Sequence, residues 1–135
     1  MENLDSKARV RLSADIETMF DLRKEFLTAL KRRVPTAVRE FPLDPTSRDD
    51  QIFLRETTLR GVEEMFEALM TLKNSKTHRQ SQVKDFDRDH FLEEIVDSFN
   101  YFFNVLLYLG VTPEEFMSAY ESKHNIIMRR LEDGY

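Results

Sequence analysis

Apolar residues recur with helical spacing in four stretches of the chain, and strand-like alternation is absent. Steps of three and four residues predict amphipathic helices over about Ser13–Arg33, Asp50–Lys73, Asp89–Leu109 and Pro113–Leu131. Thr112 supplies an N-cap for the last of these, followed by a proline at the first helical position and a glutamate at the capping-box position. The pattern predicts an all-α fold, a four-helix bundle-like unit.

Each predicted helix has an apolar face that we expect to be buried. In chain order these faces consist of Ile16, Met19, Phe20, Phe26, Leu27 and Leu30; of Leu59, Val62, Phe66 and Leu69; of Phe91, Ile95, Phe99, Phe102 and Leu106; and of Phe116, Ala119, Tyr120 and Ile127. Between the helices lie a proline-rich connection, a polar loop over Asn74–Asp87, and Gly110, which we expect to end the third helix.

Composition limits the class of protein. The 135 residues are 41% hydrophobic and 33% charged, which is typical of one domain, here residues 1–135. No apolar run approaches the roughly 18 residues of a membrane span, and Met1–Asp5 lacks a signal peptide's apolar stretch, so we expect a cytoplasmic protein that does not enter a membrane. The net charge of −5 argues against a nucleic-acid partner.

The absence of cysteine and the scarcity of histidine limit the chemistry further. Without cysteine there are no disulfides, thiolate metal sites or cysteine nucleophiles, and the three histidines lack a paired spacing for zinc. Any bound metal must therefore be held by oxygen.

Two acidic clusters of the same form, Glu63-Glu64-x-x-Glu67 and Glu93-Glu94-x-x-Asp97, lie about 30 residues apart on the second and third predicted helices. Carboxylates three residues apart share a helix face. One such pair is ordinarily a solvated face, but two opposed pairs would gather carboxylates that tolerate each other only around a cation. Mg²⁺ fits, because it prefers oxygen ligands and binds through a few carboxylates plus substrate phosphates.

The fourth predicted helix has two cations on its apolar face. Lys123 and Arg130 project in the same direction, two turns and about 10 Å apart. They either extend past the apolar edge to pair with surface glutamates, or bind phosphates whose metal ions the acidic clusters hold.

The polar loop contains the basic residues Lys73, Lys76, His78, Arg79 and Lys84. It is either simply solvated or, if the metal site exists, able to cover a triphosphate. We interpret His90 and His124 as helix-surface or outer groups rather than metal ligands.

Several segments resemble one protein family. Phe91–Phe99, Leu109–Glu115, Tyr120–Lys123 and Arg130, with the terminal Gly134-Tyr135, resemble the dimeric all-α dUTPases of the MazG-like nucleoside triphosphate pyrophosphohydrolase superfamily. The signature of that superfamily is Glu-Glu-x-x-Glu, a spacer, then Glu-x-x-Asp. The resemblance covers about Arg60 to Tyr135.

The resemblance implies a Mg²⁺-dependent enzyme, with Mn²⁺ able to substitute, that hydrolyses the α–β phosphate link of dUTP or another nucleoside triphosphate to the monophosphate and pyrophosphate. It places metal ligation on Glu64, Glu67, Glu94 and Asp97, and phosphate contacts on Lys123 and Arg130. Glu64 or Glu63 would orient or deprotonate the attacking water. It also implies a homodimer, with a tetramer as the larger alternative.

The departures from the family concern the nucleoside. His124 and Ile127 stand where the dimeric dUTPases commonly have Asn, and Arg23 stands near the position of a glutamine that contacts uracil. Base and sugar recognition therefore falls to candidates such as Arg23, Asn100, Asn104 and Lys76, with Phe20, Phe26 or Phe53 either stacking on the base or packing in the core.

A function of another class fits the same pattern. A non-catalytic helical adaptor or regulatory protein would use its phenylalanine-rich surfaces to bind a partner helix, and its acidic clusters would only increase solubility. Inward-facing Lys123 and Arg130 beside paired carboxylates would favour the enzyme, because an adaptor has no need of that arrangement.

Overall fold

The structure is a computed structural model that describes residues 16–80 and 85–134. These residues form four α-helices, one short 3-10 helix and no strand, which confirms the predicted all-α class. They divide into two compact units, one of residues up to Pro42 together with Leu106 onward, the other of Leu43–Val105. The prediction of one domain over residues 1–135 stays a prediction.

The first unit contains helix α2, Ile16–Arg33, the 3-10 helix η1, Pro35–Ala37, and helix α5, Pro113–Glu132. Phe20 and Leu27 of α2 are buried, as the apolar pattern predicts, and the rings of Phe20 and Phe116 lie 6.3 Å apart between α2 and the first turn of α5. Ser13, the predicted start of the first helix, lies outside the described residues.

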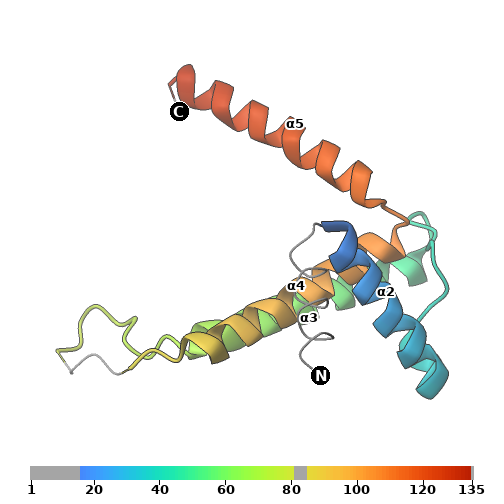
Figure 1. The fold of residues 1–135 in the computed structure, drawn as a ribbon, viewed down its shortest axis with the longest axis horizontal. Helices are drawn as coiled ribbons and strands as arrows, with labels where there is room; N and C mark the ends of the chain where they lie inside the picture. The colour runs from blue at the N-terminus through green and yellow to red at the C-terminus, as the bar shows by residue number, and fades with distance from the viewer. Residues whose placement is uncertain (1–15, 81–84, 135) are drawn as a thin grey trace, which may run out of the picture. The chain divides into compact units, whose positions relative to one another are not determined.

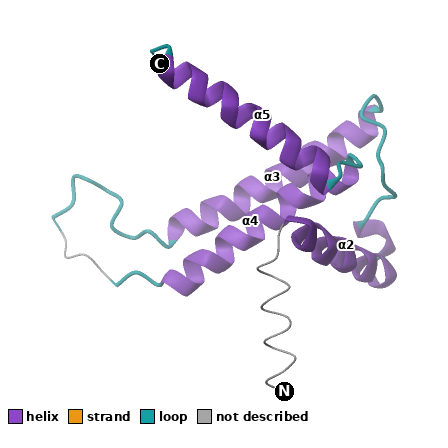
Figure 2. Cartoon of the chain, turned by 45° about the horizontal axis from the view of Figure 1, so that its top comes forward, coloured by secondary structure: helices purple, strands orange, loops and turns teal. Residues whose placement is uncertain are grey.

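The second unit is a pair of antiparallel helices that lie side by side (Figures 1 and 2). Helix α3 spans Arg48–Met70, and helix α4 spans Arg88–Tyr108, whose last turn belongs to the first unit. Ser47 caps α3 by accepting a hydrogen bond from the backbone of Asp50, so the helix begins two residues before the predicted start. It ends three residues before the predicted Lys73.

The predicted ends of α4 and α5 agree closely with the structure. The Asp87 carboxylate accepts a hydrogen bond from the backbone N–H of His90, which caps the first turn of α4, and Gly110 ends this helix region with a φ of 70°. Thr112 accepts from the Glu115 N–H at 3.1 Å, as the capping pattern predicts.

Two of the predicted buried faces are exposed in the chain. On α3 the exposed fractions of Leu59, Val62, Phe66 and Leu69 lie between 38% and 61%, and on α5 Tyr120 and Ile127 are 66% and 43% exposed. Helix α3 instead packs through its small residues, because Thr57, Gly61 and Ala68 are buried. Met19, Phe26 and Phe99 are also exposed, so the prediction of burial is wrong for them.

Among the described residues no single helix is long and apolar enough to cross a membrane, and only α4 and α5 taken together, as a bent pair, reach the length and composition required.

Candidate metal centre

The site lies in the second unit, where α3 and α4 approach closely. Thr57, Gly61, Glu64 and Ala68 share one face of α3, because they are separated by steps of three and four residues. The Ser98 hydroxyl of α4 donates to the backbone carbonyl of Gly61 at 2.7 Å, and a Cβ at Gly61 would lie 2.9 Å from a ring carbon of Phe102. A small residue at this point therefore lets the two helices approach.

Three carboxylates meet beside this contact. One oxygen each of Glu64, Glu94 and Asp97 lies within 4.8 Å of the others, and these three residues could hold a metal ion. Around Mg²⁺ opposite oxygens are about 4.2 Å apart and adjacent ones about 3 Å, so side-chain movements of about an ångström bring the three to one ion. Three of the four carboxylates that the acidic pattern predicts to meet are thus close together, and metal binding by them stays a prediction.

The fourth predicted ligand, Glu67, is exposed and stands outside the group of three, although it is close enough to affect its charges. Burial, and next the negative charge of Glu67, raise the pKa of Glu64 above its ordinary value. The same two causes raise the pKa of Glu94, while nearby His90 lowers it. Within residues 16–80 and 85–134, the negative charges around these carboxylates thus outweigh the positive charge that His90 contributes.

Glu94 is largely enclosed. Its side chain is 16% exposed, and its Oε2 is buried without a hydrogen-bond partner among the described residues. A buried carboxylate oxygen without a donor is costly unless a cation or a proton satisfies it. The all-oxygen donor set suits a hard divalent cation, so the residues fit a metal ion of the Mg²⁺ type.

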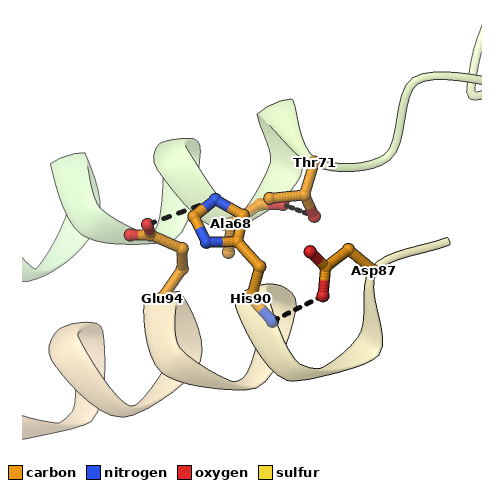
Figure 3. A network of polar contacts seen from close by, with 5 residues as sticks. All are labelled: Ala68, Thr71, Asp87, His90 and Glu94. Atoms are coloured by element: carbon orange, nitrogen blue, oxygen red, sulfur yellow. Dashed lines mark hydrogen bonds and ion pairs between the residues drawn. The ribbon is translucent and has the colours of Figure 1, made fainter.

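His90 lies one turn before Glu94 on α4, and both side chains extend from α4 toward α3 (Figure 3). Its Nε2 is 3.7 Å from Glu94 Oε1, and its side chain is 51% exposed. The sequence pattern did not single out this contact, although the four-residue spacing of His90 and Glu94 is the signal that could have identified it.

The remaining predicted site residues lie in different places. Glu63 and Lys76 are exposed, Asn100 is partly buried, and Asn104 is buried. Lys123 and Arg130 are exposed on α5, which belongs to the first unit, so their approach to the acidic group stays a prediction.

The residues of α2 that are candidates for base recognition contact neighbouring side chains of the first unit. The Arg23 guanidinium lies 4.3 Å from the centre of the Phe26 ring, a cation–π contact within its own helix. Phe20 is 3% exposed and packs against Phe116, so it has the core role that the sequence left open. Phe26 is exposed and Phe53 is partly buried.

Comparison of the chain with protein-family models, with curated proteins and with solved structures gives no match.

Proposed function

We propose that the chain is a Mg²⁺-dependent nucleoside triphosphate pyrophosphohydrolase that converts dUTP or another nucleoside triphosphate to the monophosphate and pyrophosphate. The observation that carries the proposal is the meeting of Glu64, Glu94 and Asp97 within 4.8 Å, from two helices, around a buried Glu94 oxygen without a donor. The resemblance of the acidic pattern and of the C-terminal segments to the dimeric all-α dUTPases supports the reaction type.

Glu64, Glu94 and Asp97 would hold the ion, with the exposed Glu67 joining from the rim. Bound Mg²⁺ supplies charge neutralisation at the phosphoryl oxygens and a more acidic water. Mn²⁺, which accepts the same oxygen ligands, is the expected substitute.

Glu64 is our candidate for the base that orients or deprotonates the attacking water. It belongs to the group of three carboxylates and so would lie next to a water bound to the ion. Glu63 is exposed and outside the group of three, which favours Glu64 of the two.

Lys123 and Arg130 are the proposed phosphate ligands. They stand two turns apart on the exposed face of α5, Arg130 suited to bidentate contacts and Lys123 to a point charge. Lys76, Arg23 and Asn100 remain our candidates for further substrate contacts.

The exposed apolar residues support a homodimer as the working form. Tyr120 and Leu131 of α5 and Phe66 of α3 are each more than 60% exposed. Large apolar side chains that are exposed in one chain are often buried when that chain associates with a partner. The same observation favours the alternative function, a non-catalytic helical adaptor that binds a partner through these helices.

Substitution of single ligands tests the enzyme. Glu94→Gln and Asp97→Asn remove a charge with little change of shape, and we expect each to lower the rate of pyrophosphate release by about a hundredfold or more. The control is Glu93→Gln, an exposed carboxylate of the same helix outside the group of three.

The assay uses Mg²⁺ with dUTP, dCTP, dGTP, dATP and their ribose counterparts, and circular dichroism checks the helix content of each variant. If the folded variants release pyrophosphate as fast as the unaltered protein, the site is wrong. If the unaltered protein releases none and gains no thermal stability from Mg²⁺ with a non-hydrolysable triphosphate, the adaptor is favoured.

A further inference from the structure

Within residues 16–80 and 85–134, His90 is the one residue whose side-chain nitrogen lies within ion-pair distance of a member of the carboxylate group. Its Nε2 faces Oε1 of Glu94, while Oε2 of the same carboxylate is buried and lacks a donor. The two oxygens of Glu94 are thus differentiated: one is near an imidazole, and the other remains available to an ion.

We infer that His90 is a positioning residue of the proposed metal centre, in which its Nε2–H holds Oε1 of Glu94 and so directs Oε2 toward the ion shared with Glu64 and Asp97. The inference rests on the proposed function and adds a residue to it. The present separation of 3.7 Å becomes an ordinary hydrogen bond if it shortens by about 0.7 Å.

The geometry argues against His90 as a direct ligand. Histidine nitrogens are possible members of a metal-binding group, yet the group whose donor atoms lie within 4.8 Å of one another contains Glu64, Glu94 and Asp97 and not His90. A group that orients a ligand from outside commonly changes metal affinity by 10- to 100-fold when it is removed.

The backbone of His90 is held in place by the start of α4. Its N–H donates to Asp87 Oδ1 at 3.0 Å (Figure 3 shows Asp87, His90 and Glu94). The ring of Phe86, before the helix, lies 5.4 Å from the ring of Phe91 in the first turn. An imidazole on a capped turn is better placed to orient Glu94 than one on a fraying end, because its position relative to Glu94 is fixed by the helix.

Four variants of the full chain test the inference through Mn²⁺ affinity, measured without nucleotide by the electron paramagnetic resonance signal of the free ion. His90→Gln keeps an N–H near the position of Nε2, whereas His90→Asn is too short to reach it and His90→Ala has none. His78→Ala, an exposed residue of the connection between α3 and α4, is the control.

We expect His90→Ala and His90→Asn to weaken Mn²⁺ binding by about tenfold or more, and His90→Gln and His78→Ala to stay within about threefold of the unaltered protein. A general loss of packing would not leave Mn²⁺ binding intact in His90→Gln while weakening it in His90→Asn. Helix content by circular dichroism is compared for all variants, and the Gln and Asn pair decides the result if His90→Ala folds poorly.

Three outcomes overturn the inference. If the unaltered protein binds no Mn²⁺ at millimolar concentration, the metal centre and the proposed function fail together. If it binds Mn²⁺ and all His90 variants bind equally well, or Gln fails as Asn does, the role of His90 fails while the metal centre stands. If pulsed electron paramagnetic resonance detects a nitrogen of His90 coupled to Mn²⁺, the residue is a ligand and not a positioning group.

Discussion

Ser98 of α4 donates its hydroxyl hydrogen to the backbone carbonyl of Gly61 in α3, at 2.7 Å. Glu94 lies one helical turn before Ser98, and Glu64 lies one turn after Gly61. The closest approach of the two helices and the carboxylate group are therefore neighbours, and the spacing of the helices determines whether the carboxylates can share an ion.

Enlarging Gly61 should weaken both the packing and the metal group. A Cβ there would lie 2.9 Å from Phe102 and 3.1 Å from Tyr101, and overpacking costs about 1–3 kcal/mol. Replacing glycine by alanine gains up to about 1 kcal/mol of helix propensity, so we expect Gly61→Ala to be destabilising by about 0–2 kcal/mol and the β-branched Gly61→Val to be more destabilising. Thermal unfolding and Mn²⁺ titration measure the two effects.

The control for Gly61→Val is Arg55→Val, which introduces the same side chain at an exposed position of α3. Equal unfolding temperatures and equal Mn²⁺ affinities for these two variants would contradict the role of the close helix contact.

The raised pKa values of Glu64 and Glu94 predict how stability changes with pH when no metal is bound. The folded chain holds these protons more tightly than the unfolded chain, so their contribution to stability is complete below the ordinary value of 4.5 and is lost as the pH rises through the raised pKa values. Glu94→Gln, which stays neutral, should therefore be more stable than the unaltered protein at neutral pH, with the difference disappearing near pH 4.

Thermal unfolding from about pH 4 to pH 7, in a buffer with a chelator, measures this difference. Glu93→Gln should show no such trend. A stability difference between Glu94→Gln and the unaltered protein that is constant over the whole range would show that Glu94 is an ordinary surface carboxylate.

Removing the cationic side chains of α5 should lower kcat/KM for the nucleotide and leave the affinity for the metal ion unchanged. Arg130→Gln and Lys123→Gln are expected to lower kcat/KM for the preferred nucleotide by about 10- to 100-fold, because each removes a charge-assisted contact with phosphate. Arg129→Gln, a neighbour on the polar side of the same helix, is the control.

Steady-state kinetics and Mn²⁺ titration separate the two properties. If Arg130→Gln and Arg129→Gln have the same kcat/KM, the phosphate role of Arg130 is excluded, and the alternative in which it pairs with surface glutamates is favoured.

The exposed side of α5 should stabilise the expected dimer. Tyr120 and Leu131 are 66% and 63% exposed, and burying two such side chains is worth about 3 kcal/mol. Replacing both by serine should therefore weaken dimerisation by roughly 100-fold, as measured by sedimentation equilibrium. The same double replacement of Glu121 and Asn125, about 110° around α5 from this pair, should have little effect. Equal weakening by the two pairs would exclude this surface.

The acidic repeat predicts the carboxylate group because residues three positions apart lie on the same face of their own helix. This property depends only on the local sequence, and it holds for both helices. The helix caps at Thr112 and the end at Gly110 are likewise local, so their residues predict them directly. The buried side of α3 is different. Leu59 and Phe66 have the hydrophobicity expected of a core, but Gly61 and Ala68 face α4, and close helix packing selects for size as well as for hydrophobicity.

Glu67 and His90 show a second limit of the sequence. The repeat treats Glu67 and Asp97 as equivalent, because each follows a glutamate by three residues on an exposed part of its helix, yet only Asp97 belongs to the group of three. The spacing within one helix does not decide this difference, because it depends on how the two helices face each other. His90 is not part of the acidic repeat. Its contact with Glu94 depends on the side-chain rotamers of both residues, which the sequence does not specify.

Glu64 lies six residues before the end of α3 at Met70, and Glu94 lies six residues after the start of α4 at Arg88. Both are thus about 9 Å along their helices from the connecting segment. The geometry of the proposed ion site should therefore not depend on the length of that segment. A reporter peptide inserted near Ser75 is expected to leave the three carboxylates in place, whatever it does to substrate contacts at Lys76.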